Sequence, residues 1–395
     1  MQQVLLLFFS IFTKIQKEKL IGNIRRKLQD KKIKVLSIRC EERYIVLEVS
    51  DTAEARCVLT STLGIDRICV ARKTWNDYSH VMRAISDIGK DIILPKEKFL
   101  IRIKLSTNDL NSLNYKERDL EFASAARLTS ELSSRGARPA ISEKRVDRTI
   151  ESYIGNRYAY VCLDITSSLG GLPFNSQSQK VITCIHNPLS VLSCMISMRC
   201  GFLPQIVLPY TDEEDLKNKV KLCRPIINMI DKRRYQVSLA HIHFPYVLDI
   251  NIKKMVLESI YYKILTSLSG DILIVSLSAA VSPFWYISSI VRDVISSGKI
   301  PWTPSIFASK ITDAEIRSNR MVDVAAINGF QSKAIPPNSR SYQPSVLKDK
   351  KVNPKLYEKY RQIINDVSHR SVAAGSKMVS FNVGSNYIHD IVNSI

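Results

Sequence analysis

Apolar and polar positions along the first part of the chain follow an α+β pattern. Apolar residues at Val4–Phe12 form a run that predicts a buried strand. Apolar residues then recur at helical spacing while basic residues take the other positions, which predicts an amphipathic helix with a basic outer face. Strands are expected at 4–12, 34–38, 44–49 and 67–71, and helices at 11–28 and 53–63. This order is that of a ferredoxin-like sheet, which we assign to residues 1–74.

A second α+β unit is expected at residues 75–168. Its helices are predicted at 78–88 and 121–134, and its strands at 98–105 and 158–165. The segment 135–148 carries five basic residues and predicts an exposed, mobile loop.

The pattern changes after a polar linker at 169–179, which is rich in Ser, Gly, Gln and Asn. Short apolar runs alternate with helical stretches over residues 180–395. Strands are expected at 181–185, 205–209, 237–243 and 271–276, and helices at 189–199, 213–230, 251–268 and 282–297. Buried strands separated by helices predict a doubly wound α/β domain with a mostly parallel sheet.

Net charge narrows the class of partner. The chain has 57 Lys and Arg against 37 Asp and Glu, a formal charge of +20. Such an excess favours a polyanionic partner, because each neutralised phosphate releases condensed counterions. An anionic membrane surface fits the sign as well, but we favour nucleic acid. The run Val4–Phe12 is too short to span a bilayer and no Lys or Arg precedes it, so we expect a cytoplasmic protein without a membrane partner.

Eight cysteines are present, and no two of them form a CxxC pair. Most lie within apolar runs, which predicts buried, reduced thiols in a cytosolic protein. No cysteine follows Cys223.

Three short segments, taken in order, resemble one protein family. Phe99–Lys104 reads as a basic strand, Tyr158–Val161 leads into Leu169–Pro173, and Val383–Val392 reads as a late strand and final helix. Together these segments resemble the tRNA 4-thiouridine synthetases, also called tRNA sulfurtransferases. The resemblance implies a ferredoxin-like domain, an RNA-binding THUMP domain and an adenylating domain of the adenine nucleotide alpha hydrolase type with a pyrophosphate-binding loop.

The chain departs from the family at that loop. The family has Ser-Gly-Gly-Xaa-Asp-Ser-Pro between a strand and a helix, and its glycines let backbone N–H groups close on ATP phosphates. Counting back from Arg199-Cys-Gly201, the matching residues here are Ile185, His186, Asn187, Pro188, Leu189, Ser190 and Val191. Both glycines are replaced by bulkier residues, the Asp is replaced by Leu, and only the Ser is retained. Side chains at the glycine positions would crowd the phosphates, so we expect no tight ATP site and no cofactor.

The chain also lacks the cysteine on which the family's sulfur chemistry depends. Family members use a late cysteine to carry or resolve a persulfide, because a thiolate can hold and transfer sulfane sulfur. The corresponding stretch here, 334–344, contains no cysteine. We therefore expect no catalytic residues of the family type.

The first two domains are expected to grip tRNA. Structured RNA is read through shape, phosphates and unpaired ends, so a basic strand and helix can hold an acceptor stem and 3′ end. The resemblance also implies a homodimer, and a third domain kept as a structural or partner-binding relic. The expected tRNA contacts are Lys14, Lys17, Arg25, Arg26, Arg102, Lys104, Lys116, Arg118, Arg127, Arg135 and Arg138.

Other clusters have a plain and a chemical interpretation. His241 and His243 share a strand face like a metal pair, yet no Cys or carboxylate cluster accompanies them, so we expect no metal. Cys184 and His186 could pair as nucleophile and base, but alternate strand positions also pack the core. Residues 212–216 are interpreted as a helix cap rather than an acidic site, and residues 284–286 as core rather than a base-stacking site.

Two rival functions stay open. The chain could be an active tRNA sulfurtransferase, or another tRNA-modifying enzyme, with a divergent nucleotide site. It could also be a structural subunit that recruits a modifying enzyme. ATP binding separates the first alternative from a tRNA-binding pseudoenzyme, and isolation of a partner identifies the second.

Overall fold

The structure is a computed structural model of the 395-residue chain. It describes residues 3–105, 115–140, 145–230, 236–242, 250–277, 282, 284–304, 362–363, 366 and 378–382. The chain divides into two compact units, Met1–Gly170 and Gly171–Ile395. Each unit is described by itself.

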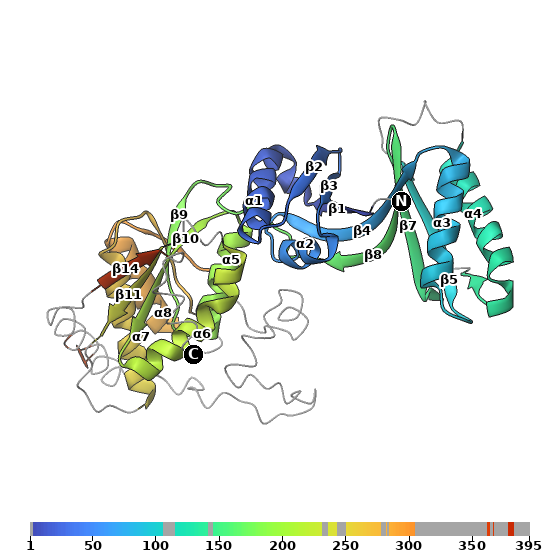
Figure 1. The fold of residues 1–395 in the computed structure, drawn as a ribbon. Helices are drawn as coiled ribbons and strands as arrows, with labels where there is room; N and C mark the ends of the chain where they lie inside the picture. Colours follow the sequence, from blue (N-terminus) through green and yellow to red (C-terminus); the bar gives the residue numbers. More distant parts are fainter. Residues whose placement is uncertain are drawn as a thin grey trace, which may run out of the picture. The chain divides into compact units, whose positions relative to one another are not determined.

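The first part of unit one has the ferredoxin-like order that the sequence predicts (Figure 1). Its strands lie in the order β2-β3-β1-β4, and β1 pairs antiparallel with both of its neighbours. Strand β1 is shorter than predicted, because the chain turns into a 3-10 helix, η1, before α1 begins. The elements are β1 (Gln3–Phe9), η1 (Ile11–Gln16), α1 (Lys17–Asp30), β2 (Val35–Cys40), β3 (Tyr44–Val49), α2 (Thr52–Leu59) and β4 (Ile65–Trp75).

The second part of unit one continues the same sheet. Strand β8 pairs antiparallel with β4 along its length, which gives one eight-stranded sheet in the order β2-β3-β1-β4-β8-β7-β5-β6. The predicted boundary near residue 74 falls at the end of β4. The elements are α3 (Tyr78–Ile92), β5 (Lys98–Leu105), α4 (Glu117–Glu131), η3 (Ser133–Arg135), β6 (Arg138–Pro139), β7 (Arg148–Ile154) and β8 (Tyr158–Ser167).

The prediction of a mobile loop over 135–148 is wrong at both ends. Arg135 ends η3, and β6 pairs parallel with β5 through Arg138 and Pro139. Arg148 begins β7, which the sequence analysis did not predict and which also pairs parallel with β5. Residues 141–144 lie outside the described residues.

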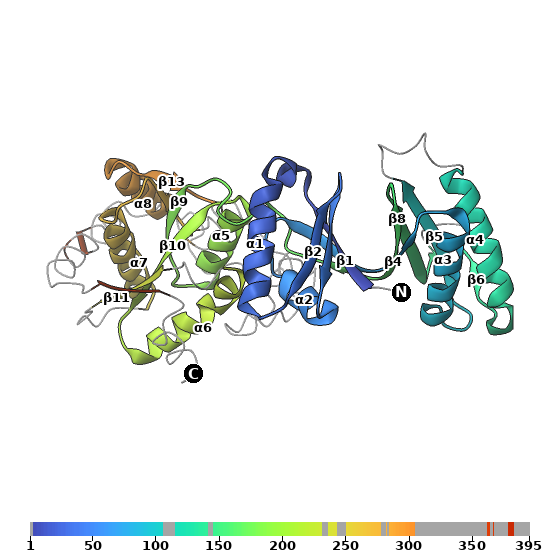
Figure 2. The ribbon, with the colours of Figure 1, turned by 45° about the horizontal axis from the view of Figure 1, so that its top comes forward.

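Strand β1 is buried on both faces, which explains its uninterrupted apolar run. Leu5 and Leu7 pack with Leu20 and Ile24 of α1. Val4 and Leu6 point to the other face, into a cluster that includes the aromatic rings of β3, β7 and β8. Helices α3 and α4 lie side by side and pack on β5, β7 and β8 through a third apolar cluster (Figure 2).

The expectation of eight reduced thiols is wrong for one pair. Cys69 of β4 and Cys162 of β8 form a disulfide, and their Cα atoms are 6.0 Å apart. Both are buried and lie far apart in the sequence, so no CxxC spacing could reveal them. Antiparallel pairing of β4 with β8 brings them together. The other six cysteines are free.

Unit two is the predicted doubly wound α/β fold. Its sheet has the order β13-β12-β9-β10-β11-β14, and all neighbours are parallel except β11 and β14. Helices α5 and α6 cover one face of the sheet, and α7 and α8 the other (Figures 1 and 2). The elements are β9 (Lys180–Cys184), α5 (Pro188–Arg199), β10 (Leu203–Tyr210), α6 (Glu213–Met229), β11 (Gln236–His241), α7 (Ile250–Thr266), β12 (Ile272–Ile274), α8 (Phe284–Ser296), β13 (Ile300–Trp302) and β14 (Met378–Asn382).

The strand order reverses at β9. Strands β10 and β11 follow on one side of it, and β12 and β13 lie on the other. Ligands of doubly wound folds bind at such a switch point, outside the carboxyl ends of the strands. The segment Ile185–Asn187 leaves β9 at this point, so the fold puts the family's loop position where a ligand would bind.

The last described strand, β14, covers Met378–Asn382, just before the predicted strand and helix of 383–392, which lie outside the described residues. Among the residues that the structure describes, no helix combines the length and apolar character needed to cross a membrane.

Candidate nucleotide loop and RNA surface

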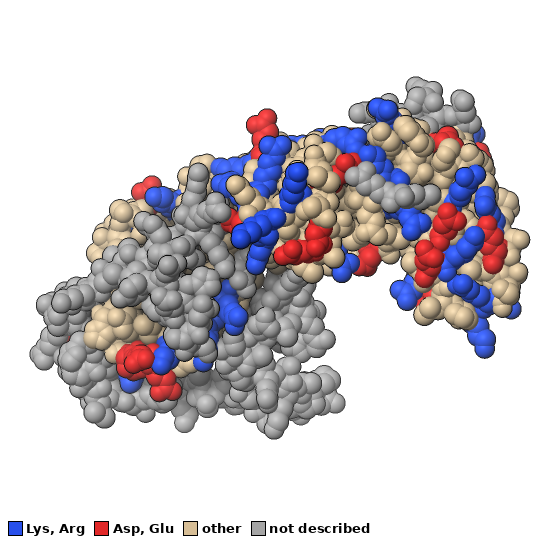
Figure 3. Space-filling view, viewed as in Figure 1, with Lys and Arg blue, Asp and Glu red and all other residues tan. Residues whose placement is uncertain are grey.

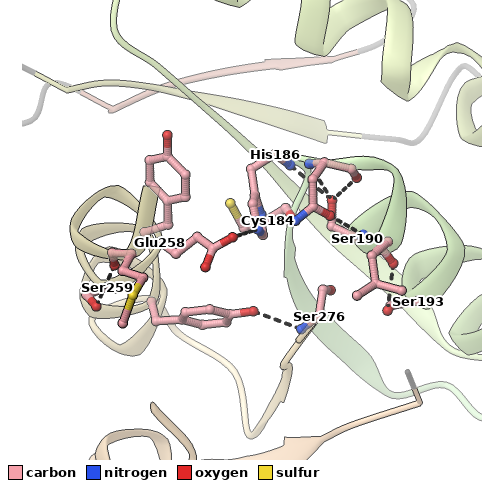
Figure 4. A network of polar contacts seen from close by, with 12 residues as sticks. Cys184, His186, Ser190, Ser193, Glu258, Ser259 and Ser276 are labelled. Carbon is pink, nitrogen blue, oxygen red and sulfur yellow. Dashed lines mark hydrogen bonds and ion pairs between the residues drawn. The ribbon is translucent and has the colours of Figure 1, made fainter. Parts of the chain in front are cut away.

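The loop between β9 and α5 is closed by its own side chains. Asn187 is the N-cap of α5, and its side-chain oxygen accepts a hydrogen bond from the Ser190 N–H at 2.8 Å. The Ser190 hydroxyl in turn accepts the His186 N–H at 3.0 Å and the Asn187 N–H at 3.1 Å. This reciprocal arrangement is a capping box. Figure 4 shows the Ser190 hydroxyl at its centre.

These bonds use the donors that an anion would need. A helix N-terminus binds phosphate because its first N–H groups lack intrahelical partners. Here the N–H groups of His186, Asn187 and Ser190 are all engaged within the loop. Pro188 occupies the first helical position, where it has no N–H to offer. The loop therefore lacks the open row of backbone donors that cradles phosphates.

A buried polar cluster lies beside the loop. His186 and Glu258 of α7 have side chains that are only 4% and 5% exposed, and His186 Nε2 lies 3.6 Å from Glu258 Oε1 (Figure 4). No hydrogen bond to that nitrogen is found within the described residues. The His186 ring also packs against Tyr261, with centroids 5.5 Å apart. Lys219 of α6 reaches the same tyrosine, 3.4 Å from its hydroxyl, while bonding Asp215 at 2.8 Å.

This cluster borders a pocket of about 330 Å³. Such a volume is at the lower end of small-ligand pockets. Two lysines and one carboxylate give its otherwise mostly apolar lining a net positive charge. The lining residues are His186, Asn187, Lys253, Lys254, Leu257, Glu258 and Tyr261.

Cys184 and His186 do not form a nucleophile–base pair. The His186 Nδ1 atom lies 3.4 Å from the backbone oxygen of Cys184. Complete burial raises the pKa of the Cys184 thiol far above its ordinary value; Lys219 opposes that shift and Glu258 adds to it. A thiol held in this neutral form is a poor nucleophile. The core interpretation therefore holds for Cys184.

The remaining clusters divide between their two interpretations. Asp212 caps α6 by accepting the Asp215 N–H at 2.9 Å, as predicted. Tyr286 is buried as predicted, but Phe284 is 73% exposed, so the core interpretation is wrong for that residue. His241 is exposed and packs on Tyr210, while His243 lies outside the described residues. Within the described ranges, no three His, Cys, Asp or Glu residues gather as a metal site.

Basic residues expected to bind tRNA lie on several elements of unit one. Lys14 and Arg25 are exposed on η1 and α1, although Lys14 stands 3.9 Å from Glu42. Lys17 donates to the backbone oxygens of Glu41 and Glu42, and Arg26 donates to its own helix. Figure 3 shows basic side chains gathered over the part of the unit that holds α1 and β2, whereas basic and acidic side chains alternate on α3 and α4.

The remaining expected contacts lie in or beside β5, α4, η3 and β6, and they differ in their exposure and in their bonding partners. Lys104 lies 3.2 Å from Glu151 Oε2 and 3.3 Å from the Tyr153 hydroxyl. Arg127 bonds Glu131 at 2.9 Å. The other members of this group have their side chains exposed or half-buried: Arg102, Lys116, Arg118, Arg135 and Arg138.

Sequence reasoning missed one aromatic and basic cluster in unit one. Trp75 at the end of β4 lies directly across from Tyr158 at the start of β8, with ring centroids 5.2 Å apart. The Arg157 guanidinium lies 5.5 Å from the Trp75 ring centre and 5.4 Å from that of Tyr158. The only sequence signal was that Arg157 and Tyr158 are adjacent. The pairing of β8 with β4 then brings Trp75 beside them and forms the cluster.

The fold and these surfaces define a class: a two-unit protein with a ferredoxin-like start, a basic first unit and a doubly wound second unit. Comparison with known proteins is consistent with this class. A probable tRNA sulfurtransferase of Methanosarcina mazei is 26% identical over 184 residues, which cover 47% of this chain and 44% of that protein. The equivalent protein of Methanosarcina acetivorans is 23% identical over a segment of the same length. The match thus spans less than half the length of these curated relatives. No protein-family model matches the chain.

Solved structures share the fold over a much larger part of the chain. A 4-thiouridine synthetase, solved with RNA and bound ATP, aligns with a TM-score of 0.64 at 12% identity and covers 96% of this chain and 100% of that one. The protein PH1313 of Pyrococcus horikoshii aligns with a TM-score of 0.61 at 18% identity and covers 82% and 99%. The chain is therefore similar in sequence to curated tRNA sulfurtransferases over 47% of its length, in line with the resemblance noted above, and it shares the fold of these two solved structures.

Proposed function

We propose that this chain is a tRNA-binding protein built like the tRNA sulfurtransferases that does not thiolate tRNA by itself. Relationship to that family and the +20 charge support tRNA as the ligand. The capping box of Asn187 and Ser190 is the observation that carries the second half of the proposal. The N-terminal end of α5 satisfies its own donors, so a nucleotide has few backbone groups left to bind.

We assign tRNA binding to unit one, which would contact the acceptor stem and the 3′ end of the tRNA. Lys104 carries particular weight because Glu151 is its ion-pair partner. Burial raises the pKa of Glu151, but the Tyr153 hydrogen bond and the charges of Lys104 and Arg67 outweigh it, so the pKa is lowered. Replacing Lys104 would remove a cation and leave Glu151 paired with Arg67 at 3.3 Å.

A pair of double variants tests this assignment. Arg102→Ala with Lys104→Ala should weaken tRNA binding more than Lys253→Ala with Lys254→Ala, which removes the same charge from unit two. Each lost phosphate contact should flatten the logarithmic salt dependence by about one unit. Binding is measured by filter retention over a series of salt concentrations. Equal losses of tRNA affinity in the two double variants would mean that the positive charge acts diffusely and that unit one is not the main RNA-binding surface.

A direct assay tests the missing activity. The protein is incubated with unmodified tRNA, ATP and a persulfide donor, and the digested nucleosides are analysed by mass spectrometry. We expect 4-thiouridine at background level, because the loop lacks an open phosphate cradle and segment 334–344, outside the described residues, has no cysteine. Preorganised donors are a large catalytic contribution, and losing one costs about a hundredfold or more in rate. Thiolated product, or tRNA-dependent release of pyrophosphate, would overturn the proposal.

A second candidate is a tRNA-modifying enzyme with a rebuilt site. The observation in its favour is the 330 Å³ pocket beside His186, where a buried imidazole nitrogen faces a buried carboxylate. Calorimetric titration with ATP separates the candidates. Micromolar affinity for ATP that is weakened by Lys254→Ala would favour the enzyme with a rebuilt site. No detectable binding at millimolar ATP would favour the pseudoenzyme. The third candidate, a subunit that recruits a modifying enzyme, requires a stable partner in a pull-down.

A further inference from the structure

A ring pair on unit one has the features of a base-stacking site. Trp75 is 49% exposed although it stands in a regular strand position of β4. A large apolar ring normally gains by burial, so leaving half of it in water costs free energy unless something covers it. Tyr158 backs the ring from the neighbouring strand at 5.2 Å, with 33° between the ring planes.

Cations surround this ring pair. Arg157 lies over both rings, and Lys73 Nζ lies 4.2 Å from the centre of Tyr158. Arg39 approaches the same tyrosine at 5.4 Å. Glu48 bonds both Lys73 at 2.9 Å and Arg39 at 2.8 Å, so its one negative charge is shared between two cations. Arg157 adds a third positive charge, and its side chain is exposed.

The cluster is held in place before any ligand arrives. Asn76, next to Trp75, donates its side-chain amide to the backbone oxygens of Gly155 at 3.1 Å and Asn156 at 2.6 Å. These bonds fasten the turn that carries Arg157 to the end of β4. The β4–β8 register fixes Trp75 opposite Tyr158. Such preorganisation reduces the entropy lost on binding.

We propose that Trp75, backed by Tyr158 and flanked by Arg157, stacks an unpaired base of the bound RNA. An aromatic face supplies stacking for any base, and the guanidinium can contact the adjoining phosphate. The net positive surroundings favour a polyanion over an apolar peptide. This inference rests on the proposed function, because it names the group of the RNA that unit one would read.

Substitution of the ring tests the inference in the full-length protein. Trp75→Ala should weaken binding of tRNA with unpaired 3′ nucleotides by about 5- to 150-fold, the equivalent of about 1–3 kcal/mol for one stacked base. Trp75→Phe keeps an aromatic face and should retain most of the affinity. Phe122→Ala is the matched control, because Phe122 is also an exposed aromatic of unit one, at 78%. Circular dichroism checks that each variant is folded.

Two further readouts distinguish stacking from a structural role. Short single-stranded RNA should quench tryptophan fluorescence in the wild type, and Trp75→Phe should abolish that quenching. Arg157→Ala should flatten the salt dependence by about one unit, as expected for one phosphate contact. A merely structural tryptophan would not give the quenching result.

The outcomes separate this inference from the proposed function. If the wild type fails to bind tRNA, the proposed function is wrong and the inference falls with it. If the wild type binds and a folded Trp75→Ala protein binds equally well, only the stacking inference is wrong. Equal losses in Trp75→Ala and Phe122→Ala would also overturn it, because the effect would then not belong to this cluster.

Discussion

The hydroxyl of Ser190 holds the start of α5 together, and its removal should loosen that segment selectively. Ser190→Ala takes away the acceptor of two backbone N–H groups, those of His186 and Asn187. Ser190 is fully buried, so water cannot simply take its place at the same position. Leaving buried donors without a partner costs about 1–3 kcal/mol.

Hydrogen exchange measured by mass spectrometry on the full chain is the appropriate assay. Peptides covering residues 180–199 should exchange about 5- to 150-fold faster in Ser190→Ala than in the wild type, since tenfold corresponds to about 1.4 kcal/mol. Asn187→Ala should show a smaller effect of about 1 kcal/mol, typical of a lost N-cap. Affinity for tRNA should not change, because the proposed grip lies in unit one.

Ser193→Ala is the matched control for this prediction. Ser193 is as buried as Ser190 and lies on the same helix, and its hydroxyl donates to the Leu189 oxygen. In Ser193→Ala the N–H groups of His186 and Asn187 keep the Ser190 hydroxyl as their acceptor, so protection of residues 180–199 should stay close to wild type. Equal deprotection by the two substitutions would refute the idea that the capping box closes the loop.

Three further predictions concern unit one and its stability. Burial raises the pKa of Glu131, but hydrogen bonds from Ser86, Arg127 and Lys90 outweigh this effect and lower the pKa to about 2. Glu131→Gln should therefore lower the Tm at pH 7. Calorimetry should find the Tm values of the variant and the wild type converging as the pH falls from about 4.5 towards 2. Alkylation of the unfolded chain should label the six free cysteines, and all eight only after reduction of the Cys69–Cys162 bond; equal labelling before and after would exclude that bond. Gly22→Ala in α1 should raise stability by about 0.5–1 kcal/mol, because its Cβ meets nothing closer than 3.7 Å. Gly89→Ala should instead lower stability, because its Cβ would lie 2.6 Å from Leu128, and urea unfolding compares the two.

Elements with strong periodicity were predictable from the sequence. The helix α3 and the strands β3, β5 and β9 lie where apolar spacing predicts them. Strand β7 was missed because Thr, Glu and Ser interrupt its apolar residues, and only pairing with β5 and β8 stabilises it. The local sequence pattern therefore identified the elements that bury one regular face. It failed where pairing with strands distant in the sequence determines the secondary structure.

Candidate sites divide in the same way. The loop at Ile185–Val191 could be found because its residues are contiguous and follow a strand. Its closing bonds could also be anticipated in kind, since Asn, Pro and Ser in this order are typical of a helix start. The His186–Glu258 contact and the Trp75–Tyr158 ring pair join parts of the chain that are far apart in the sequence, so residue spacing could not predict either of them. They depend on sheet order and register.

Backbone conformation gives an independent reason to expect no phosphate-binding loop at Ile185–Val191. A glycine-rich phosphate loop uses glycine so that the backbone can adopt left-handed conformations and approach the ligand closely. Among the described residues, none from Ile185 to Val191 has a positive φ, and Asn187 itself is extended at φ −154°. Ordinary conformations tolerate side chains, so His186 and Asn187 cause no strain here. In a ligand-dependent loop, phosphate oxygens satisfy the helix donors; here Asn187 and Ser190 do so. The start of α5 thus has these donors satisfied without a nucleotide.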